Sequence, residues 1–218
     1  MTPSCTGVIL AGGRASRYGG QPKGLERVGG TRVIDRVARA LESVSDGLLL
    51  IANDAAAAAW LPGVRVAADI LADRGSLGGI HAALVHAATP VLVVAWDMPF
   101  VPAALLAALR ALGERDAADI AIPESDSRRG AEPLCAYYTP ACVGPIERRL
   151  AADDRRVIGF FGDVRVARLP AEAVRRFGDP AHLFMNVNTP DELALAERHA
   201  SSRPPATDGH DRRRKEPR

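Results

Sequence analysis

A glycine-rich, basic segment after the first apolar run is the part of the chain best suited to bind an anion. It extends from Leu10 to Gly24, and four glycines precede its lysine. Glycine lets backbone N–H groups approach an anion closely, and Arg14, Arg17 and Lys23 supply positive charge. The segment fits a polyphosphate, but its glycine content alone fits a flexible loop with solvated arginines equally well. The two common glycine-rich phosphate motifs, G-x-x-x-x-G-K-[ST] and G-x-G-x-x-G, do not occur.

The use of lysine favours the phosphate interpretation. Of the 28 basic residues, 26 are arginine, and the two lysines are Lys23 and Lys215. The body of the chain therefore has one lysine, and it lies in this segment. A compact ammonium can bridge phosphate oxygens, whereas a planar guanidinium favours bidentate contacts.

An aspartate ends the most apolar strand pattern of the sequence. The run 91–95 is entirely aliphatic, and Trp96, Asp97, Met98 and Pro99 follow it. Asp97 should lie at the carboxyl edge of the sheet, facing the glycine-rich segment if the strands 7–10 and 91–95 are neighbours. A carboxylate there suits Mg²⁺, which usually takes one or two carboxylates and fills its other positions with water and phosphates. The alternative is that Asp97 caps a turn.

Four other polar residues follow predicted strands. Asn53 and Asp69 could contact a base or a ribose, although both residue types are common in turns at strand ends. Asn186 and Asn188 would share one face of a short extended run, and the alternative is that they form loop and cap hydrogen bonds.

The elements that position these residues alternate between short apolar runs and helical patterns. This alternation predicts an α/β fold with a mainly parallel sheet covered on both faces. Thr31 is the expected cap of the first helix, and residues 189–192, Thr-Pro-Asp-Glu, form a capping-box signal for the last, which should end near residue 199. The expected strands are 7–10, 48–52, 64–67, 91–95, 120–123, 135–138 and 164–169, and the expected internal helices are 31–44, 79–88 and 103–112.

Composition limits the class of protein. The chain has 218 residues, of which 47% are hydrophobic and 25% charged, enough for one α/β domain over residues 1–200. Residues 1–200 carry 22 basic and 23 acidic side chains, so nucleic acid is not an expected partner, and no apolar run is long enough for a membrane helix. Three cysteines without a C-x-x-C pair indicate reduced thiols and a cytoplasmic protein.

Residues 201–218 should form a disordered basic tail, because they contain no large apolar side chain. We expect a chain truncated after residue 200 to keep its melting temperature and its nucleotide affinity. A clear fall in melting temperature on truncation would contradict this interpretation.

Five segments together resemble the molybdenum cofactor guanylyltransferase family of the nucleotidyltransferase superfamily, over residues 6–199. They are Leu10-Ala11-Gly12-Gly13 through Lys23, Trp96-Asp97-Met98-Pro99, Glu132-Pro133-Leu134, Arg155-Arg156-Val157, and Asn186-Val187-Asn188-Thr189-Pro190. The resemblance implies a three-layer α/β/α sandwich with a Rossmann-like, mostly parallel sheet. It also implies GTP and molybdopterin as substrates, Mg²⁺ as cofactor, and molybdoenzymes or their chaperones as protein partners.

The resemblance also implies roles for individual residues. Leu10, Ala11, Gly12 and Gly13 would line the guanine nucleotide, Lys23 and Arg17 would be near its phosphates, and Asn53 and Asp69 would contact the nucleoside. Asp97 matches the position that binds both GTP and Mg²⁺, and Asn186 and Asn188 match amides on the pterin side. The sequence departs from the family at Trp96, where cysteine is frequent, and at Ser76, where proline is frequent.

Two other functions remain open at this stage. One is the same transfer with CTP or with another acceptor such as a sugar phosphate; relatives that use CTP tend to have L-A-A-G, so Gly12 favours guanine. The other is a carrier that binds the finished cofactor without catalysis, which would have no need for Asp97 beside Lys23.

Overall fold

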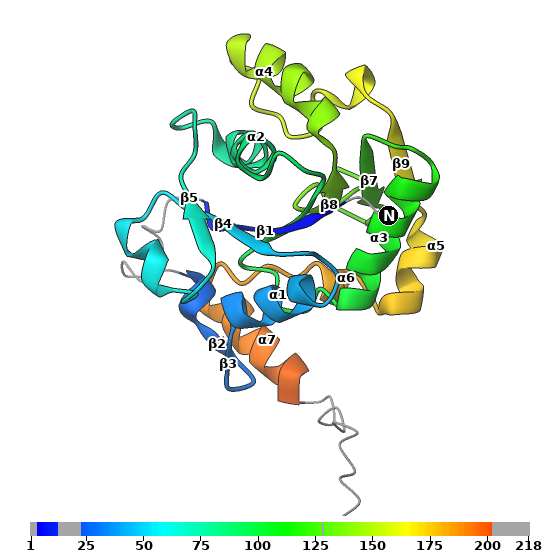
Figure 1. The fold of residues 1–218 in the computed structure, drawn as a ribbon. Coiled ribbons are helices and arrows are strands. Elements are labelled where there is room, and N and C mark those ends of the chain that lie inside the picture. The colour runs from blue at the N-terminus through cyan, green and yellow to red at the C-terminus, as the bar shows by residue number, and fades with distance from the viewer. Residues whose placement is uncertain (1–3, 13–22, 128, 202–218) are drawn as a thin grey trace, which may run out of the picture.

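The central feature of the computed structural model, which describes residues 4–12, 23–127 and 129–201, is a seven-stranded sheet (Figure 1). Its strand order is β5-β4-β1-β6-β8-β7-β9, and β8 is antiparallel to both of its neighbours while the other pairs are parallel. The strands are β1 (Thr6–Leu10), β4 (Leu48–Ile51), β5 (Arg65–Ala67), β6 (Val91–Ala95), β7 (Ile120–Pro123), β8 (Cys135–Tyr138) and β9 (Val166–Leu169). A separate hairpin joins β2 (Arg27–Val28) to β3 (Thr31–Arg32).

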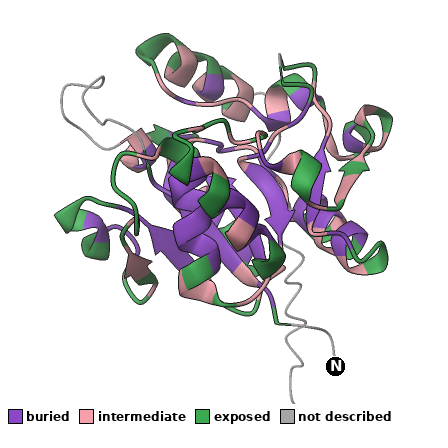
Figure 2. Cartoon of the chain, turned by 90° about the horizontal axis from the view of Figure 1, so that it is seen from above, coloured by how far each residue is buried: buried purple, intermediate pink, exposed green. Residues whose placement is uncertain are grey.

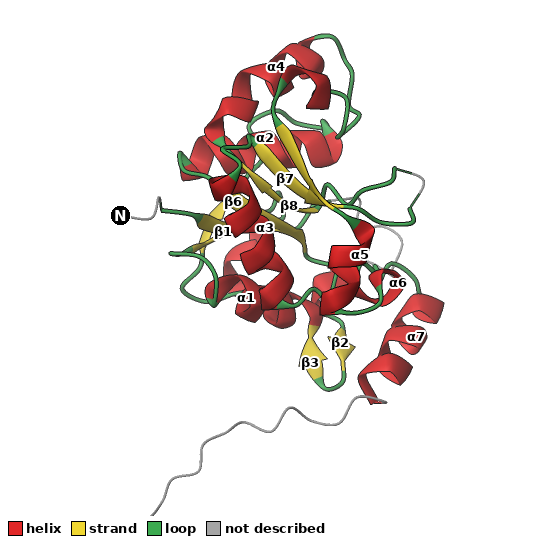
Figure 3. Ribbon diagram, turned by 90° about the vertical axis from the view of Figure 1, so that its right-hand side faces the viewer, coloured by secondary structure: helices red, strands yellow, loops and turns green. Residues whose placement is uncertain are grey.

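Helices cover both faces of this sheet (Figures 1 and 3). They are α1 (Val33–Glu42), α2 (Gly75–Ala87), α3 (Ala103–Arg115), α4 (Val143–Ala151), α5 (Ala171–Val174), α6 (Pro180–Leu183) and α7 (Pro190–Ser201). Short 3-10 turns include η2 (Lys23–Leu25) and η3 (Ala55–Ala59). No helix among the described residues is both long and apolar enough to cross a membrane.

Alternation along the strands produces two hydrophobic layers. In β1, Ile9 packs in the cluster that contains side chains of α1 and α3, whereas Val8 and Leu10 pack in the cluster formed with α2 and α4. Burial of each large aliphatic side chain contributes about 1.5–3 kcal/mol, so both layers stabilise the sheet. Strands β1, β4, β6, β7 and β8 are buried at all or nearly all of their residues, whereas the edge strands β5 and β9 are partly exposed (Figure 2). The expected three-layer α/β/α sandwich with a mostly parallel sheet is confirmed.

The register brings the ends of the central strands to one edge. Leu10 pairs with Ile51 of β4 on one side and with Ala95 of β6 on the other. The strands 7–10 and 91–95 are therefore neighbours, as the prediction for Asp97 required. Residues that directly follow β1, β4, β5 and β6 are gathered along the same carboxyl edge of the sheet.

The start of the first helix differs from the prediction. Thr31 belongs to strand β3 instead of capping a helix, and the residue before the helix is Arg32, which makes no side-chain cap hydrogen bond. Arg32 instead forms two hydrogen bonds to the Asp35 carboxylate, at 2.8 and 2.7 Å. The hairpin places Val33 N–H 2.9 Å from the Glu26 carbonyl oxygen, which satisfies a donor that a cap would otherwise serve.

The last helix begins as predicted but is capped differently. Thr189 Oγ1 accepts a hydrogen bond from Glu192 N–H at 3.2 Å, whereas the Glu192 carboxylate accepts from Asn188 N–H at 2.7 Å and not from the threonine. The helix extends to Ser201, two residues beyond the expected end, so the first residue of the expected tail is helical. The rest of that tail, residues 202–218, lies outside the described residues.

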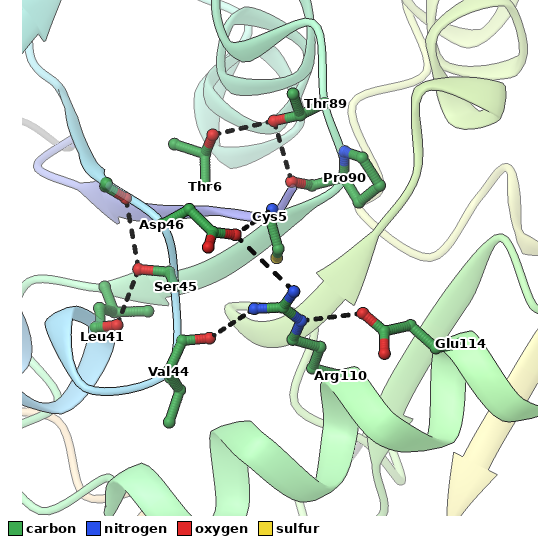
Figure 4. Close-up of polar contacts among 11 residues, drawn as sticks. Cys5, Thr6, Leu41, Val44, Ser45, Asp46, Thr89, Pro90, Arg110 and Glu114 are labelled. Carbon is green, nitrogen blue, oxygen red and sulfur yellow. Dashed lines mark hydrogen bonds and ion pairs between the residues drawn. The ribbon is translucent and has the colours of Figure 1, made fainter. Parts of the chain in front are cut away.

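A polar cluster holds the opposite, amino edge of the sheet together (Figure 4). Cys5 N–H donates to the Asp46 carboxylate at 2.8 Å, and Arg110 donates to the Val44 carbonyl oxygen at 3.0 Å and to Glu114 at 2.8 Å. The three cysteines are free and buried, as expected, and burial raises the pKa of the Cys5 thiol to about 11. A thiol of this kind is protonated and unreactive at neutral pH. This edge therefore has a structural role.

Candidate active site

A cavity of about 760 Å³ opens at the carboxyl edge of the sheet. It lies against the ends of β1, β4 and β6, the residues after β5, and the start of α2. Seven residues singled out in the sequence line it: Leu10, Gly12, Lys23, Asn53, Asp69, Asp97 and Asn188. The structure thus collects in one place residues that lie up to 178 positions apart in the sequence, by the parallel arrangement of the strands.

Other candidates are not brought into the cavity. Ala11 is buried beside the sheet, and its N–H donates to Ile51 instead of lining the cavity. Asn186 does not line it either, and its amide donates to the Phe184 carbonyl oxygen at 3.4 Å. Gly13 and Arg17 lie outside the described residues.

Lys23 is held by a segment from the other end of the chain. Its Nζ donates to Asn188 Oδ1 at 2.6 Å, and both residues line the cavity. The segment with Asn188 is fixed in turn, because Val187 N–H donates to the Asp97 carbonyl oxygen at 2.9 Å. The lysine, the amide and the aspartate therefore form one connected unit.

Asp97 is a mostly buried carboxylate beside this lysine. Burial raises the pKa of Asp97 above its ordinary value, while its own backbone N–H and the Lys23 ammonium oppose the shift. The raised pKa indicates that the groups present compensate its negative charge only in part, so an added cation would be favourable.

The donor set fits a magnesium ion shared with a substrate. The described residues contain no group of three or more His, Cys, Asp or Glu side chains that could hold a metal by themselves. A single carboxylate at the wall of a cavity suits Mg²⁺ when water and substrate oxygens can complete its coordination. Asp97 is the residue that would hold such an ion.

Asn53 and Asp69 are locked to each other. Asn53 Nδ2 donates to Asp69 Oδ2 at 2.8 Å, and Asp69 N–H donates to Asn53 Oδ1 at 2.8 Å. The two residues follow the neighbouring strands β4 and β5, so the pair joins the ends of both strands. Asn53 therefore fixes the orientation of the Asp69 carboxylate at the cavity wall.

We expect Asn53→Ala to weaken nucleotide binding by releasing Asp69. Loss of two hydrogen bonds at an exposed position should cost about 1 kcal/mol, or roughly five-fold in affinity. Calorimetric titration with GTP measures the effect, with Ser43→Ala, a hydroxyl remote from the cavity, as the control. An Asp69→Ala, Asn53→Ala double variant should bind no worse than Asp69→Ala alone. Additive losses would show instead that Asn53 contacts the nucleotide directly.

The sequence analysis assigned no role to Arg155, which also lines the cavity. Its guanidinium donates to the Asp73 carbonyl oxygen at 3.0 Å and to the Asp153 carboxylate at 3.0 and 3.1 Å. Arg74 donates to the same carboxylate at 2.6 Å. Asp153 thus connects the loop before α2 to the loop after α4. The segment Arg155-Arg156-Val157 is part of the family resemblance, but its spacing does not predict this arrangement, because the residues meet only through packing of α2 on α4.

The electrostatics of the cavity favour an anion that brings a cation with it. The described lining residues include the cations Lys23 and Arg155, but also three carboxylates, from Asp69, Asp73 and Asp97. The amino end of α2, a 13-residue helix that starts at Gly75, adds backbone N–H groups at the cavity. A triphosphate alone would be repelled by the carboxylates, so a divalent cation would balance the site.

Sequence comparison finds relatives over most of the chain. Residues 7–167 match the model of the MobA-like NTP transferase domain. The chain is 40% identical over 192 residues to a "Probable molybdenum cofactor guanylyltransferase" of Pelotomaculum thermopropionicum, covering 88% of this chain and 91% of the relative. It is 35% identical over 193 residues to the "Molybdenum cofactor guanylyltransferase" of Desulfosudis oleivorans, covering 88% and 94%.

Structural comparison agrees with these relatives. The molybdopterin-guanine dinucleotide biosynthesis protein A of Archaeoglobus fulgidus superposes with a TM-score of 0.76 at 31% sequence identity. The match covers 90% of this chain and 98% of that protein. The similarity therefore extends over most of the chain.

Proposed function

Because the chain belongs to the MobA-like NTP transferase family, we propose that its cavity transfers GMP from GTP to the terminal phosphate of molybdopterin. The products are pyrophosphate and the guanine dinucleotide form of the cofactor. The observation that carries this proposal is the convergence of Lys23, Asp97 and the α2 amino end on one cavity at the carboxyl edge of the sheet. GTP supply and molybdoenzyme assembly would place the reaction in the cytoplasm, with molybdoenzymes or their chaperones as recipients of the product.

The proposed transfer requires few catalytic groups from the protein. The attacking group is a phosphate oxygen that is already ionised at neutral pH, so the reaction requires neither a serine or cysteine nucleophile nor a strong general base. What the chain must supply is alignment of two anions and stabilisation of the charge that develops on the α-phosphate and the leaving pyrophosphate.

Lys23 is the residue we assign to this charge. Its ammonium is oriented by the Asn188 amide oxygen at 2.6 Å, which fixes one of its three N–H donors and leaves two for phosphate oxygens. Arg17, which lies outside the described residues, is proposed to act beside it.

Asp97 is proposed to hold Mg²⁺ through its carboxylate. When bound, the ion would neutralise phosphate charge that the three carboxylates of the lining would otherwise repel. Asp69, held by Asn53, is proposed to contact the nucleoside together with Leu10, Gly12 and Gly13, while Ala11 lies behind them with its N–H bonded to the Ile51 carbonyl oxygen. Asn186 and Asn188 are proposed to face the pterin side, with Asn188 also orienting Lys23.

The transfer is tested by pyrophosphate release. The protein mixed with GTP, Mg²⁺ and molybdopterin should release pyrophosphate in amounts that match the dinucleotide formed, and omission of molybdopterin should abolish both. Binding of the substrates without any pyrophosphate would overturn the proposal in favour of a carrier of the finished cofactor.

The nucleotide is tested by competition. We propose GTP over CTP for two reasons. The relatives from Pelotomaculum thermopropionicum and Desulfosudis oleivorans are named guanylyltransferases, and the protein from Archaeoglobus fulgidus is named for guanine dinucleotide biosynthesis. In addition, Gly12 follows Ala11 at the start of the site, where relatives that use CTP tend to have a second alanine. Calorimetry should show tighter binding of GTP than of CTP in the presence of Mg²⁺. Tighter binding of CTP would indicate a cytidylyl transferase, and turnover with a sugar phosphate would indicate a different acceptor.

A further inference from the structure

Gly24, the residue directly after Lys23, lies against an aromatic ring. A Cβ atom added at Gly24 would clash with Cε3 of Trp96 and would be 2.8 Å from Cδ2 and 3.2 Å from Cζ3 of the same ring. These atoms belong to the six-membered ring of the indole, and real Cβ atoms do not approach others so closely. Gly24 is buried, and it does not adopt the left-handed conformation of Gly29 and Gly30. The ring, and not the backbone conformation, therefore excludes a side chain here.

The indole of Trp96 is itself fixed in place. It is 5% exposed, and its ring stacks on Trp60 with centroids 5.2 Å apart and planes 25° apart. The Trp96 N–H donates to the Leu10 carbonyl oxygen at 3.1 Å, which ties its backbone to the end of β1. The stack on Trp60 and the burial of the ring oppose a displacement that would admit a Cβ atom. It also has little free surface on which a nucleobase could stack.

Trp96 and Gly24 connect the two main functional residues of the cavity. Trp96 directly precedes Asp97, and Gly24 directly follows Lys23. The contact between them sets how closely the turn η2 approaches the end of β6. The contact therefore fixes the position of the Lys23 backbone, from which the side chain extends to Asn188 and towards Asp97.

We propose that Trp96 is a positioning residue for Lys23, acting through its contact with Gly24. This inference rests on the proposed function, since it assumes that Lys23 contacts the phosphates of the nucleotide. The flat ring supports the turn, and glycine allows the turn to approach closely enough. A side chain at position 24 would lift the turn and move the Lys23 ammonium away from the phosphates.

The test is Gly24→Ala, with Gly47→Ala as the matched control. Gly47 also lacks a left-handed conformation, and a Cβ there meets nothing within 4 Å. We expect Gly24→Ala to raise the KM for GTP at least ten-fold, with a melting temperature that the clash lowers but that stays above the assay temperature. Gly47→Ala should change neither quantity. An unchanged KM in Gly24→Ala would overturn the inference.

Two further variants separate positioning of Lys23 from general packing. In a Lys23→Ala background, Gly24→Ala should raise the KM for GTP no further, because the residue it displaces is already absent. In a Trp96→Ala background, which removes the ring, Gly24→Ala should cost less than in the parent. Independent, multiplicative effects in both backgrounds would overturn the inference.

If Gly24→Ala yields little folded protein, Trp96→Leu tests the inference by changing the ring instead of the glycine. It keeps Gly24 and should raise the KM for GTP, because the turn loses its flat support, and an unchanged KM would count against the role of Trp96.

Failure of the proposed function gives a different result. In that case the parent protein itself would release no pyrophosphate from GTP.

Discussion

Replacing Asp97 with asparagine should leave a folded protein that turns over GTP about 10²–10³-fold more slowly, the usual cost of removing one electrostatic stabiliser from an active site. Asparagine has nearly the same volume and can form similar hydrogen bonds, so a turn-capping role would survive the change. A role as a metal ligand would not, because the anionic oxygen is lost. Excess Mg²⁺ should recover part of the rate by mass action.

The stability of this variant provides a second readout. Burial raises the pKa of Asp97, so the folded protein keeps this proton to higher pH than the unfolded chain does. The contribution of this carboxyl to stability is therefore present below its unfolded pKa and is lost as the pH rises through the raised, folded value. Because asparagine does not ionise, the melting temperature of Asp97→Asn should fall less than that of the parent as the pH rises. If the variant turned over GTP at the parental rate, Asp97 would not be the ligand of the metal ion.

Lys23→Arg should impair the enzyme although it preserves the charge. The Lys23 ammonium lies 2.6 Å from Asn188 Oδ1 in a partly buried position, and a guanidinium is larger and planar and cannot occupy the same point. We expect GTP affinity to fall at least ten-fold while the melting temperature is retained. Calorimetry with GTP and Mg²⁺ measures the loss, and Arg115→Lys, an exposed exchange on α3, is the control. Parental affinity and turnover would show that Lys23 does not bind the phosphates and that its role is limited to the contact with Asn188.

The fold was predictable where strands are buried on both faces. The bounds of β6, β7 and β8 agree with the aliphatic and aromatic runs of the sequence, because a turn-favouring residue, Asp97, Pro123 or Pro140, lies at or within two residues of the end of each run. The start of α1 was not predictable in this way. Strands β2 and β3 have two residues each, so they carry no periodic signal in the sequence. Thr31, the expected cap of the helix, pairs in this hairpin instead.

The site was predictable to the extent that it follows from parallel strands. Asn53, Asp69 and Asp97 each follow a strand, and a parallel sheet brings such residues to one edge. The contribution of Arg155 and the contact of Gly24 with Trp96 depend on packing between segments far apart in the sequence, which no spacing rule describes. Asn186 is a case in which a spacing rule was not sufficient. The alternating pattern placed it on the same face as Asn188, but of the two only Asn188 lines the cavity.

A crystal structure with Mg²⁺ and a GTP analogue that cannot be cleaved at the α-phosphate tests the central claim most directly. We expect the nucleotide to occupy the cavity at the carboxyl edge of the sheet, with the guanosine near Asp69, phosphate oxygens within hydrogen-bond distance of Lys23 Nζ, and the metal on an Asp97 oxygen. A nucleotide bound elsewhere, or in this cavity with its phosphates away from both Lys23 and Asp97, would contradict the account.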